Sequence, residues 1–198
     1  MHSQQDTYEV NLEEHPTAKA LVQRCEQFFA EVQNLYVSWH VFEEPMSDRI
    51  ISTPGQDLEK YLNSHYGPGN PFYEDFCKYV RQGIEKNEGW CANIEIDGRK
   101  YRRSRVSLPK YETKYFSITT VYMNSQEEYK GQYHRHPYGE INCVILLDDT
   151  AELKGMAGWQ GAGWTSPGAG THHYPEVRRL MNEFANTINN LSRCVEAR

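Results

Sequence analysis

Hydrophobic and polar positions change their spacing once along the chain, near Trp90. Before that point, apolar residues recur every three or four positions over residues 17–34, 57–66 and 70–84, which is the period of helices with one buried face. The third of these segments opens with an Asn-Pro pair, which is typical of an N-cap followed by a first-turn proline. The spacing therefore predicts a helical segment over residues 1–88.

The second half of the chain alternates with a period of two, as strands with one buried face do. Residues 91–96 and 99–108 alternate on either side of Asp97-Gly98, a dipeptide that favours a tight hairpin turn. A strand rich in β-branched and aromatic residues follows over 115–123, and short strands separated by Gly and Pro come after it. We therefore expect an α+β fold, with N-terminal helices packed on an antiparallel sheet that forms a barrel or a double sheet.

Composition excludes several classes of protein. The chain has 198 residues, enough to bury a core, and its net charge of −6 argues against a general nucleic-acid binder, which needs a basic surface. No apolar run approaches the length of a membrane span, and the polar N-terminus lacks a signal core. Five scattered cysteines without a C-x-x-C pair favour reduced thiols, so we expect a cytoplasmic protein without nucleic-acid or membrane partners.

One stretch concentrates side chains that can do chemistry. His134 and His136 are separated by one residue, so on a strand both point to the same face. Glu140 returns to that face if the Pro-Tyr-Gly turn before it re-enters extended structure, and His172 or His173 on a neighbouring strand would complete the cluster. Such a set suits a first-row divalent metal with open coordination positions. The same side chains can instead act directly as acid and base.

Four arginines, Arg99, Arg102, Arg103 and Arg105, lie close together in the predicted hairpin. On a strand, Arg103 and Arg105 share one face with Tyr101, and Arg102 lies on the opposite face. One interpretation is a solvated edge strand, whose charges discourage aggregation. The other is that an inward-facing guanidinium forms a bidentate pair with a substrate carboxylate. The alternation alone does not say which face is the interior one.

Two motifs resemble those of the cupin family. The string G-x-x-H-x-H-x-x-x-E over 131–140 resembles the first motif, with a shortened spacing between the glycine and the first histidine. Residues 161–172 resemble the second, although alanine stands where the family has its inner glycine. In cupins, two histidines, the glutamate and a later histidine bind a divalent metal inside a β-barrel. His172 has the usual spacing for that later histidine, but His173 is adjacent, so both remain candidates.

Longer strings are more specific. IDGRKYRRSRV, VYMNS, GQYHRHPYGEIN, GWQGAGWTSPG and HHYPEV resemble the bacterial 4-hydroxylaminobenzoate lyases of nitrobenzoate degradation, from about Trp90 to Val177. This resemblance implies a cupin-like antiparallel β-barrel over residues 89–177. It also implies conversion of 4-hydroxylaminobenzoate to protocatechuate (3,4-dihydroxybenzoate) with release of ammonia. One divalent ion (Fe, Mn or Zn, not distinguished) is expected, and no nucleotide or flavin, because the reaction needs no external electron carrier.

The resemblance further implies roles for the clustered residues. The expected metal ligands are His134, His136, Glu140 and one or both of His172 and His173. The expected catalytic residues are His134, His136, Glu140 and Tyr138, with Glu140 transferring protons if no metal is bound. The expected substrate contacts are Arg103, Arg105, Tyr133, Trp164 and Tyr174. For the aromatic side chains, packing or anchoring of a loop is the alternative interpretation.

The end of the chain departs from the family pattern. After HHYPEV, apolar residues fall at helical spacing, so residues 178–198 are predicted to form a C-terminal helix or tail. A barrel strand would then be missing or supplied by a partner chain, and a homo-oligomer is expected. Two other functions would use the same residues: a metal-dependent cupin oxygenase acting on an aromatic acid, and a non-enzymatic cupin that binds an aromatic acid.

Overall fold

Within the described parts of the chain, three helices precede the strands, as the sequence pattern predicts. The protein is represented by a computed structural model that describes residues 9–33, 54–98, 100–124, 128–179 and 188–192. The helices are α1 (Pro16–Gln33), α2 (Gln56–His65) and α3 (Pro71–Glu85). The predicted start of α3 is confirmed, because the Asn70 side chain accepts a hydrogen bond of 2.8 Å from the Phe72 amide and Pro71 occupies the first turn.

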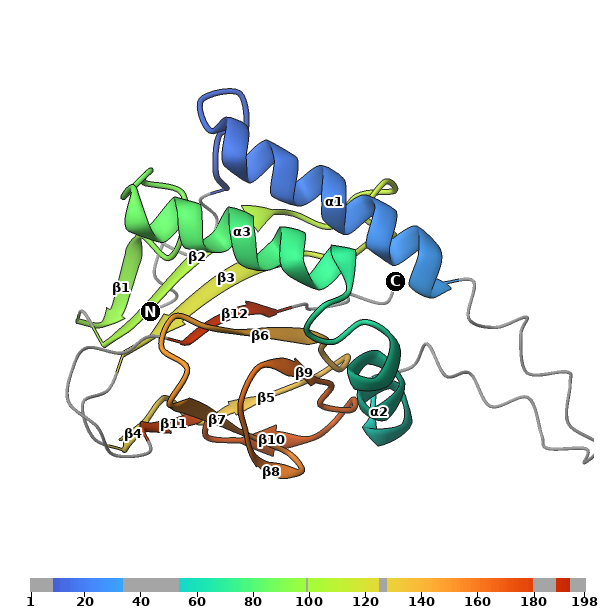
Figure 1. The fold of residues 1–198 in the computed structure, drawn as a ribbon, viewed down its shortest axis with the longest axis vertical. Helices are drawn as coiled ribbons and strands as arrows, with labels where there is room; N and C mark the ends of the chain where they lie inside the picture. Colours follow the sequence, from blue (N-terminus) through green and yellow to red (C-terminus); the bar gives the residue numbers. More distant parts are fainter. Residues whose placement is uncertain (1–8, 34–53, 99, 125–127, 180–187, 193–198) are drawn as a thin grey trace, which may run out of the picture.

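The strands of the described residues form two larger antiparallel sheets and a two-stranded ribbon (Figure 1). The six-stranded sheet has the order β1 (Ile94–Asp97), β2 (Tyr101–Ser107), β3 (Ile118–Met123), β12 (Ile188–Ser192), β6 (Asn142–Leu146), β9 (Gly163–Thr165). The four-stranded sheet has the order β4 (Tyr129–Lys130), β11 (Glu176–Arg179), β7 (Ala151–Gly155), β8 (Gly158–Gln160). The ribbon pairs β5 (His134–Arg135) with β10 (His172–His173). The predicted hairpin is confirmed, with β1 and β2 antiparallel and Asp97 opposite Tyr101.

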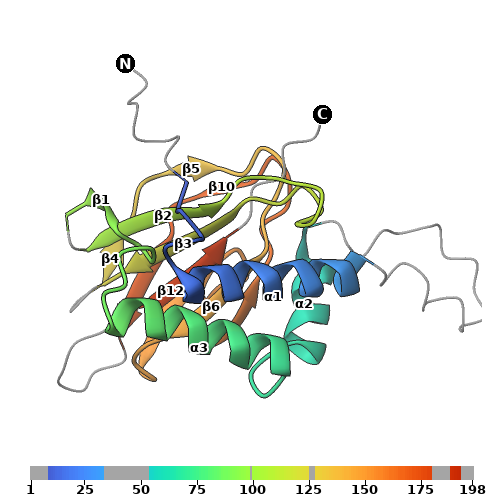
Figure 2. The same cartoon turned by 90° about the horizontal axis from the view of Figure 1, so that it is seen from above.

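Helices cover one face of the six-stranded sheet. Figures 1 and 2 show α1 and α3 side by side along that face, with the four-stranded sheet and the ribbon on the other side. A large apolar cluster, here called the helix core, fills the space under the helices. Its centre is Phe28 of α1, which stacks on Trp164 of β9 at 5.0 Å between ring centroids and meets Phe76 of α3 edge-on. Burial of these large rings is the main stabilising contribution to this layer.

A second apolar cluster, here called the inner core, lies between the two larger sheets. Its members are Val121, Met123, Val144, Leu146, Ala151, Leu153 and Val177. Strand β6 shows the division most plainly, because Cys143 and Ile145 belong to the helix core while Val144 and Leu146 belong to the inner core. Both faces of β6 are therefore buried, which explains why the four residues after Asn142 are all apolar rather than alternating.

The predicted C-terminal helix is wrong where the structure describes that part of the chain. Residues 176–179 form β11, and residues 188–192 form β12, which pairs with β3 on one side and β6 on the other. The remaining residues of the predicted helix, 180–187 and 193–198, lie outside the described ranges. A strand in this position gains backbone hydrogen bonds along both edges, and tertiary pairing of this kind overrides local helical spacing. The chain therefore supplies the strand that was predicted to be missing.

The expectation of N-terminal helices packed on antiparallel sheets is confirmed, although the described strands do not close into one hydrogen-bonded barrel. The six-stranded and four-stranded sheets face each other instead, with the ribbon beside them. Among the described residues, no helix is both long enough and apolar enough to span a membrane.

Candidate functional site

The ribbon of β5 and β10 brings three histidines together. His134 and His173 are direct partners across the ribbon, and His172 is the partner of Arg135. Directly opposed residues of antiparallel strands point to the same face, so His173 shares a face with His134, and His172 lies on the other face. His136 follows β5, where its backbone amide donates to the Thr171 carbonyl at 2.9 Å and its ring is fully buried. The ambiguity between the two adjacent histidines is thereby resolved in favour of His173.

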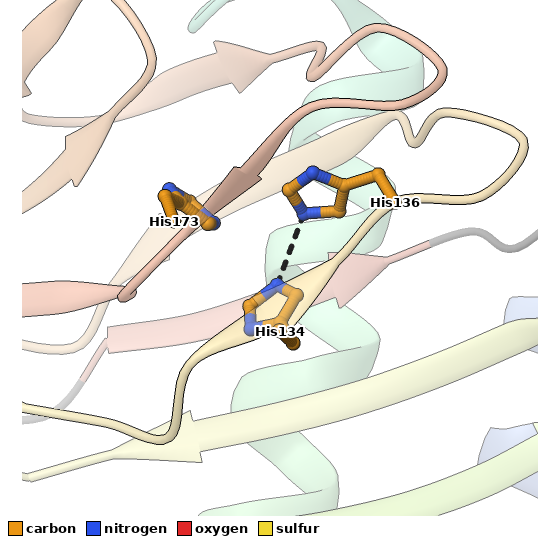
Figure 3. A group of neighbouring side chains, drawn as sticks. All are labelled: His134, His136 and His173. Atoms are coloured by element: carbon orange, nitrogen blue, oxygen red, sulfur yellow. Dashed lines mark hydrogen bonds between the residues drawn. The ribbon is translucent and has the colours of Figure 1, made fainter.

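The three rings turn toward one another, as Figure 3 shows. The Nε2 atoms of His134 and His136 are 3.0 Å apart. One ring nitrogen of each of His134, His136 and His173 lies within 4.8 Å of the others. Ring centroids are 4.8–4.9 Å apart, with interplanar angles of 61° to 87°. Three imidazole nitrogens therefore converge on one point, and we call these three residues the histidine centre.

Hydrogen bonds on the far side of two rings decide which nitrogens carry protons. The Thr171 hydroxyl donates to the Gly168 carbonyl at 2.6 Å, so it accepts from Nδ1 of His136 at 3.0 Å. The Gln132 carbonyl can only accept, so Nδ1 of His134 donates to it at 3.2 Å. In the neutral imidazoles, both Nε2 atoms then carry lone pairs and face each other. Two lone pairs at this distance repel unless a cation or a proton lies between them.

Charge considerations agree with neutral imidazoles at this centre. Burial, followed by the neighbouring His134 and His173 rings, lowers the pKa of His136 to about 4. Burial and then His134 lower the pKa of His173 to about 4 as well. Neutral imidazole is the form that binds a metal. Two nitrogens bound to one tetrahedral Zn²⁺ are about 3.3 Å apart, close to the 3.0 Å seen here. The donor set therefore fits a first-row divalent ion.

Glu140 lies beside the histidine centre. Its Oε2 atom is 3.6 Å from Nε2 of His136, the ring nitrogen that also faces His134. The preceding Gly139 has a φ of +83°, and a Cβ at that position would lie 2.7 Å from Pro54 and 3.1 Å from the Pro167 carbonyl, so only glycine fits this turn. The Glu140 amide donates to that same carbonyl at 2.9 Å. The turn predicted before Glu140 therefore does return the carboxylate to the histidines.

Helix α2 forms hydrogen bonds with residues 164–166, the segment that contacts the backbone of Glu140. The Ser166 hydroxyl donates to the Glu140 carbonyl at 3.0 Å, and the Ser166 amide donates to the buried Glu59 carboxylate at 2.8 Å. Trp164, two residues before Ser166, is held by Asn63 of α2. The Asn63 side chain both donates to the Trp164 carbonyl and accepts from the Trp164 amide. The helical first half of the chain thus helps to fix the geometry of the site.

The face of β2 that carries Tyr101, Arg103 and Arg105 is turned toward the inner core, whereas the opposite face, with the buried Ser104 and Val106, lies against the helix core. Arg103 is opposite Val121, a member of the inner core, and Tyr101 packs against that core. Burial raises the pKa of the Tyr101 hydroxyl, with Arg103 opposing the shift and Glu140 adding to it. Arg102 is on the opposite face, with its guanidinium 4.1 Å from the centroid of the Tyr122 ring.

The aromatic side chains that were predicted to act on the substrate are not part of the histidine centre. Tyr133 and Tyr174 are exposed and contact each other at 5.0 Å between ring centroids, and Tyr133 also contacts His172. All three follow the outer face of the ribbon, because they alternate with His134 and His173. Tyr138 is exposed in the turn before Glu140. Trp164 is fully buried in the helix core, where its indole nitrogen donates to the Tyr66 carbonyl at 2.8 Å. Anchoring of the loop, the alternative interpretation of Trp164, matches this position.

Two residues of the site were not singled out from the sequence. Thr171, the hydrogen-bond partner of His136, directly precedes the two candidate histidines, so a polar residue at a predicted loop-to-strand junction was the available signal. Tyr101 shares its strand face with the two predicted arginines. The alternation showed this, but it did not show that this face is turned toward the inner core.

Comparison with known proteins gives a consistent result. The model of a family described as "PnbB: 4-hydroxylaminobenzoate lyase" matches residues 42–182. A 4-hydroxylaminobenzoate lyase of Nocardioides sp. (strain LMS-CY) is 58% identical over 126 residues, covering 64% of this chain and 73% of that protein. One from Pseudomonas putida is 50% identical over 134 residues, covering 64% of this chain and 75% of its own. Among solved structures, an RmlC-like cupin protein from Ralstonia eutropha JMP134 is 14% identical, with a TM-score of 0.36 over 52% of this chain and 61% of that one.

Proposed function

The chain belongs to the 4-hydroxylaminobenzoate lyase family, and on that premise we propose that it converts 4-hydroxylaminobenzoate and water into protocatechuate and ammonia. The observation that supports this assignment most directly is the convergence of three imidazoles with the Glu140 carboxylate beside them. Arg103 and Arg105 lie on the face of β2 that is turned toward the inner core. These are the acid, base and anion-binding groups that the reaction needs.

The reaction replaces an aryl nitrogen by oxygen without an external oxidant. Protonation of the hydroxylamino oxygen lets it leave as water, and the ring becomes an electron-poor, quinone-imine-like cation. One water adds to the carbon next to the C–N carbon, a second adds at the C–N carbon itself, and nitrogen leaves as ammonia. The net consumption is one water. Nitrogen gains the two electrons that the ring loses, so a general acid, a general base and a binding site for the carboxylate suffice.

Glu140 is the residue that we assign to proton transfer with the added water. Its carboxylate is close to Nε2 of His136 and is held by a turn with little freedom. A positioned carboxylate contributes as a base through its location as much as through its basicity. If no metal is bound, His134, which is partly accessible, is the second group able to move a proton at the same place. Tyr138 belongs to this turn, and we retain it as a residue that can approach the substrate from the solvent side.

A divalent metal is part of the proposal. His134, His136 and His173 would hold it, with Glu140 as a possible fourth ligand. An ion held there acts as a Lewis acid toward oxygen. The hydrogen bonds from Nδ1 of His134 and His136 orient these imidazoles with their Nε2 lone pairs toward the centre, which is the usual second-shell arrangement of metal-binding histidines. The donor set does not distinguish Fe, Mn and Zn.

Arg105 is the better of the two candidates for the substrate carboxylate. Its side chain has no ion pair or hydrogen bond within the part of the chain that the structure describes, although it is half-buried on the interior face. An unpaired, half-buried guanidinium is costly unless it binds an anion, and its planar fork matches a carboxylate. Arg103, which is next to Tyr101 on the same face of β2, has an interaction of its own within the protein, and its charge lowers the pKa of Tyr101. We assign it to charge balance around the reacting end.

The cellular context is proposed from the cysteines. All four cysteines of the described residues (Cys25, Cys77, Cys91 and Cys143) are free and buried, which supports a reducing compartment such as the cytoplasm. The homo-oligomer remains a prediction. Its original support was partly a missing barrel strand, and β12 takes that position within the chain itself.

The test is an anaerobic incubation of the purified protein with 4-hydroxylaminobenzoate, in which ammonia and protocatechuate are quantified against substrate. Equal amounts of both products without oxygen support the lyase. Turnover that requires oxygen would replace the lyase by an aromatic-acid oxygenase, and binding without turnover in either atmosphere would replace it by a binding protein. Rates before and after chelation, and after re-addition of single metal ions, test the metal assignment on the same sample.

A further inference from the structure

Asn142, the first residue of β6, has a buried side-chain amide of which one end is unpaired. The residue is only 4% exposed, and its Nδ2 donates to the Thr165 hydroxyl at 3.1 Å. Its Oδ1 accepts no hydrogen bond from any residue in the described parts of the chain. Asn63 differs, because its Nδ2 donates to the Trp164 carbonyl and its Oδ1 accepts from the Trp164 amide. A buried amide oxygen without a donor is costly, so an orphaned one points to a donor supplied by a ligand.

The register between β6 and β9 places this amide next to Glu140. Asn142 is paired with Thr165. The same antiparallel pairing continues past the ends of both strands, because the Glu140 amide donates to the Pro167 carbonyl at 2.9 Å. Glu140 and Asn142 are therefore two residues apart on one extended segment, and their side chains point to the same side of it.

That side faces away from the helices. Ile141 and Cys143, which alternate with Glu140 and Asn142, belong to the helix core. Val144, the next residue on the Asn142 side, belongs to the inner core. Side chains two residues apart on a strand are separated by about 6.5–7 Å, so a small aromatic ligand held at Glu140 is within reach of the Asn142 amide.

We propose that Asn142 is a further catalytic residue, whose Oδ1 accepts a hydrogen bond from the nitrogen of the hydroxylamino group of the substrate. This inference rests on the proposed lyase function, in which that group lies beside Glu140 and the histidine centre. An amide oxygen can only accept. It therefore selects the end of the substrate that carries N–H and rejects the end that carries the carboxylate, which has no proton to donate.

This contact strengthens as the reaction proceeds. When the N–O bond breaks and its electron pair leaves with the departing water, nitrogen carries more positive charge, and its N–H becomes a stronger donor. The Asn142 amide is held by its bond to Thr165, so its dipole is already oriented toward the charge that develops. Asn142 neither takes nor gives a proton, so the balance of protons and electrons in the proposed reaction is unchanged.

The alternative role for Asn142 is structural, through its bond to Thr165 alone. The two roles differ in how they affect ligand affinity. A structural residue changes the affinity for all ligands of the site alike. A residue that accepts from the substrate nitrogen changes the affinity only for ligands that carry N–H at that position.

The experiment compares the affinities for 4-aminobenzoate and 4-methylbenzoate, which have similar shapes but differ in whether the para group carries N–H. Wild-type protein should prefer the amine, and Asn142→Leu should lower this preference by about 3- to 10-fold, the contribution of one hydrogen bond. Both affinities are measured on the same variant, so a partial loss of folded protein cancels in their ratio. The kcat for 4-hydroxylaminobenzoate should fall by about 10- to 100-fold, because a hydrogen bond to a charged group is the stronger one.

A second variant applies if Asn142→Leu does not fold. Asn142→Leu/Thr165→Val replaces both partners by apolar side chains, leaves neither of them unpaired, and should unfold close to the wild-type temperature. It should show the same loss of preference for the amine. Asn93→Leu is the matched control, because Asn93 is exposed and its Oδ1 already accepts from the Ser104 hydroxyl. The control should leave the preference unchanged.

An unchanged preference for the amine in both Asn142 variants would overturn the contact while leaving the lyase function intact. Absence of ammonia after incubation of the wild-type protein with 4-hydroxylaminobenzoate would overturn the lyase function and, with it, the catalytic role of Asn142. The two failures are thereby told apart, since the first is measured by ligand binding and the second by product formation.

Discussion

Thr171 holds the buried imidazole of His136 in the orientation that the centre needs, and a valine at this position would remove that hydrogen bond while preserving the side-chain shape. The Thr171 hydroxyl is 3.0 Å from Nδ1 of His136. In Thr171→Val, the Nδ1–H group is left either without an acceptor or without its proton. In the first case an unsatisfied donor stays buried, and in the second the proton moves to Nε2, where it occupies the lone pair that faces the centre.

The expected loss of metal affinity and stability in Thr171→Val follows from these two outcomes. A buried donor without an acceptor costs about 1–3 kcal/mol. Loss of a second-shell partner of a metal-binding histidine lowers metal affinity or activity by about 10- to 100-fold, which corresponds to about 1.4–2.8 kcal/mol. The two ranges overlap, so we expect Thr171→Val to weaken binding of Zn²⁺ or Mn²⁺ by about 10- to 100-fold. Some global stability is lost as well, because the same hydroxyl donates to the Gly168 carbonyl.

Competition with a chelator of known affinity measures the first quantity, and thermal unfolding in EDTA measures the second. Thr165→Val is the matched control, since it also removes a buried threonine hydroxyl, which accepts from Asn142 at 3.1 Å, but not from a histidine. We expect the control to lose stability and to retain metal affinity. Equal metal affinity in Thr171→Val and the wild type would refute the role of this hydrogen bond, and a wild type that binds no divalent ion would refute the metal centre itself.

Three further predictions use neighbouring residues as their controls. His173→Ala should abolish metal binding and turnover, whereas His172→Ala, on the exposed face of the ribbon, should keep both; the opposite result would contradict the assigned register. Arg105→Ala should raise KM for the substrate by about 10- to 100-fold, as expected for a lost charge-assisted hydrogen bond, and Arg102→Ala should leave KM unchanged. Steady-state kinetics on both variants measure this difference. Metal-free protein should be most stable above about pH 6.5 and should lose stability as pH falls through about 4, because the unfolded chain protonates imidazoles, such as that of His136, which the fold holds neutral. Urea unfolding in EDTA across this pH range measures how the free energy of unfolding changes, and a flat profile would argue against neutral, buried histidines.

Local patterns sufficed for much of the fold because they report local physics. Helical spacing before Trp90 predicted the helices, since one apolar stripe must be buried against a sheet. The Asn-Pro start of α3 likewise depends only on neighbouring residues, and the positive φ of Gly139 in the turn before Glu140 is also a local property. The His-x-His spacing placed two imidazoles together for the same reason, because strand side chains alternate whatever the strand packs against.

Long-range pairing decided what local patterns left open or predicted wrongly. The spacing of the last residues is compatible with a helix, yet residues 188–192 form β12, because β3 and β6 together offer hydrogen bonds on both of its edges. Which of two adjacent histidines joins the centre depends on the register of β10 against β5, a property of two segments far apart in the chain. Spacing from the second motif favoured His172, and register selects His173.

The sequence by itself thus determined the helical first half, the antiparallel second half and the family, because periodicity and motif strings are written in neighbouring residues. Only the tertiary structure decided which face of β2 is turned toward the inner core, that Trp164 is a core residue, and that Thr171 is the hydrogen-bond partner of His136. The physical reason is that burial and hydrogen-bond partnership are relations between segments, and a strand carries two possible faces until a second sheet covers one of them.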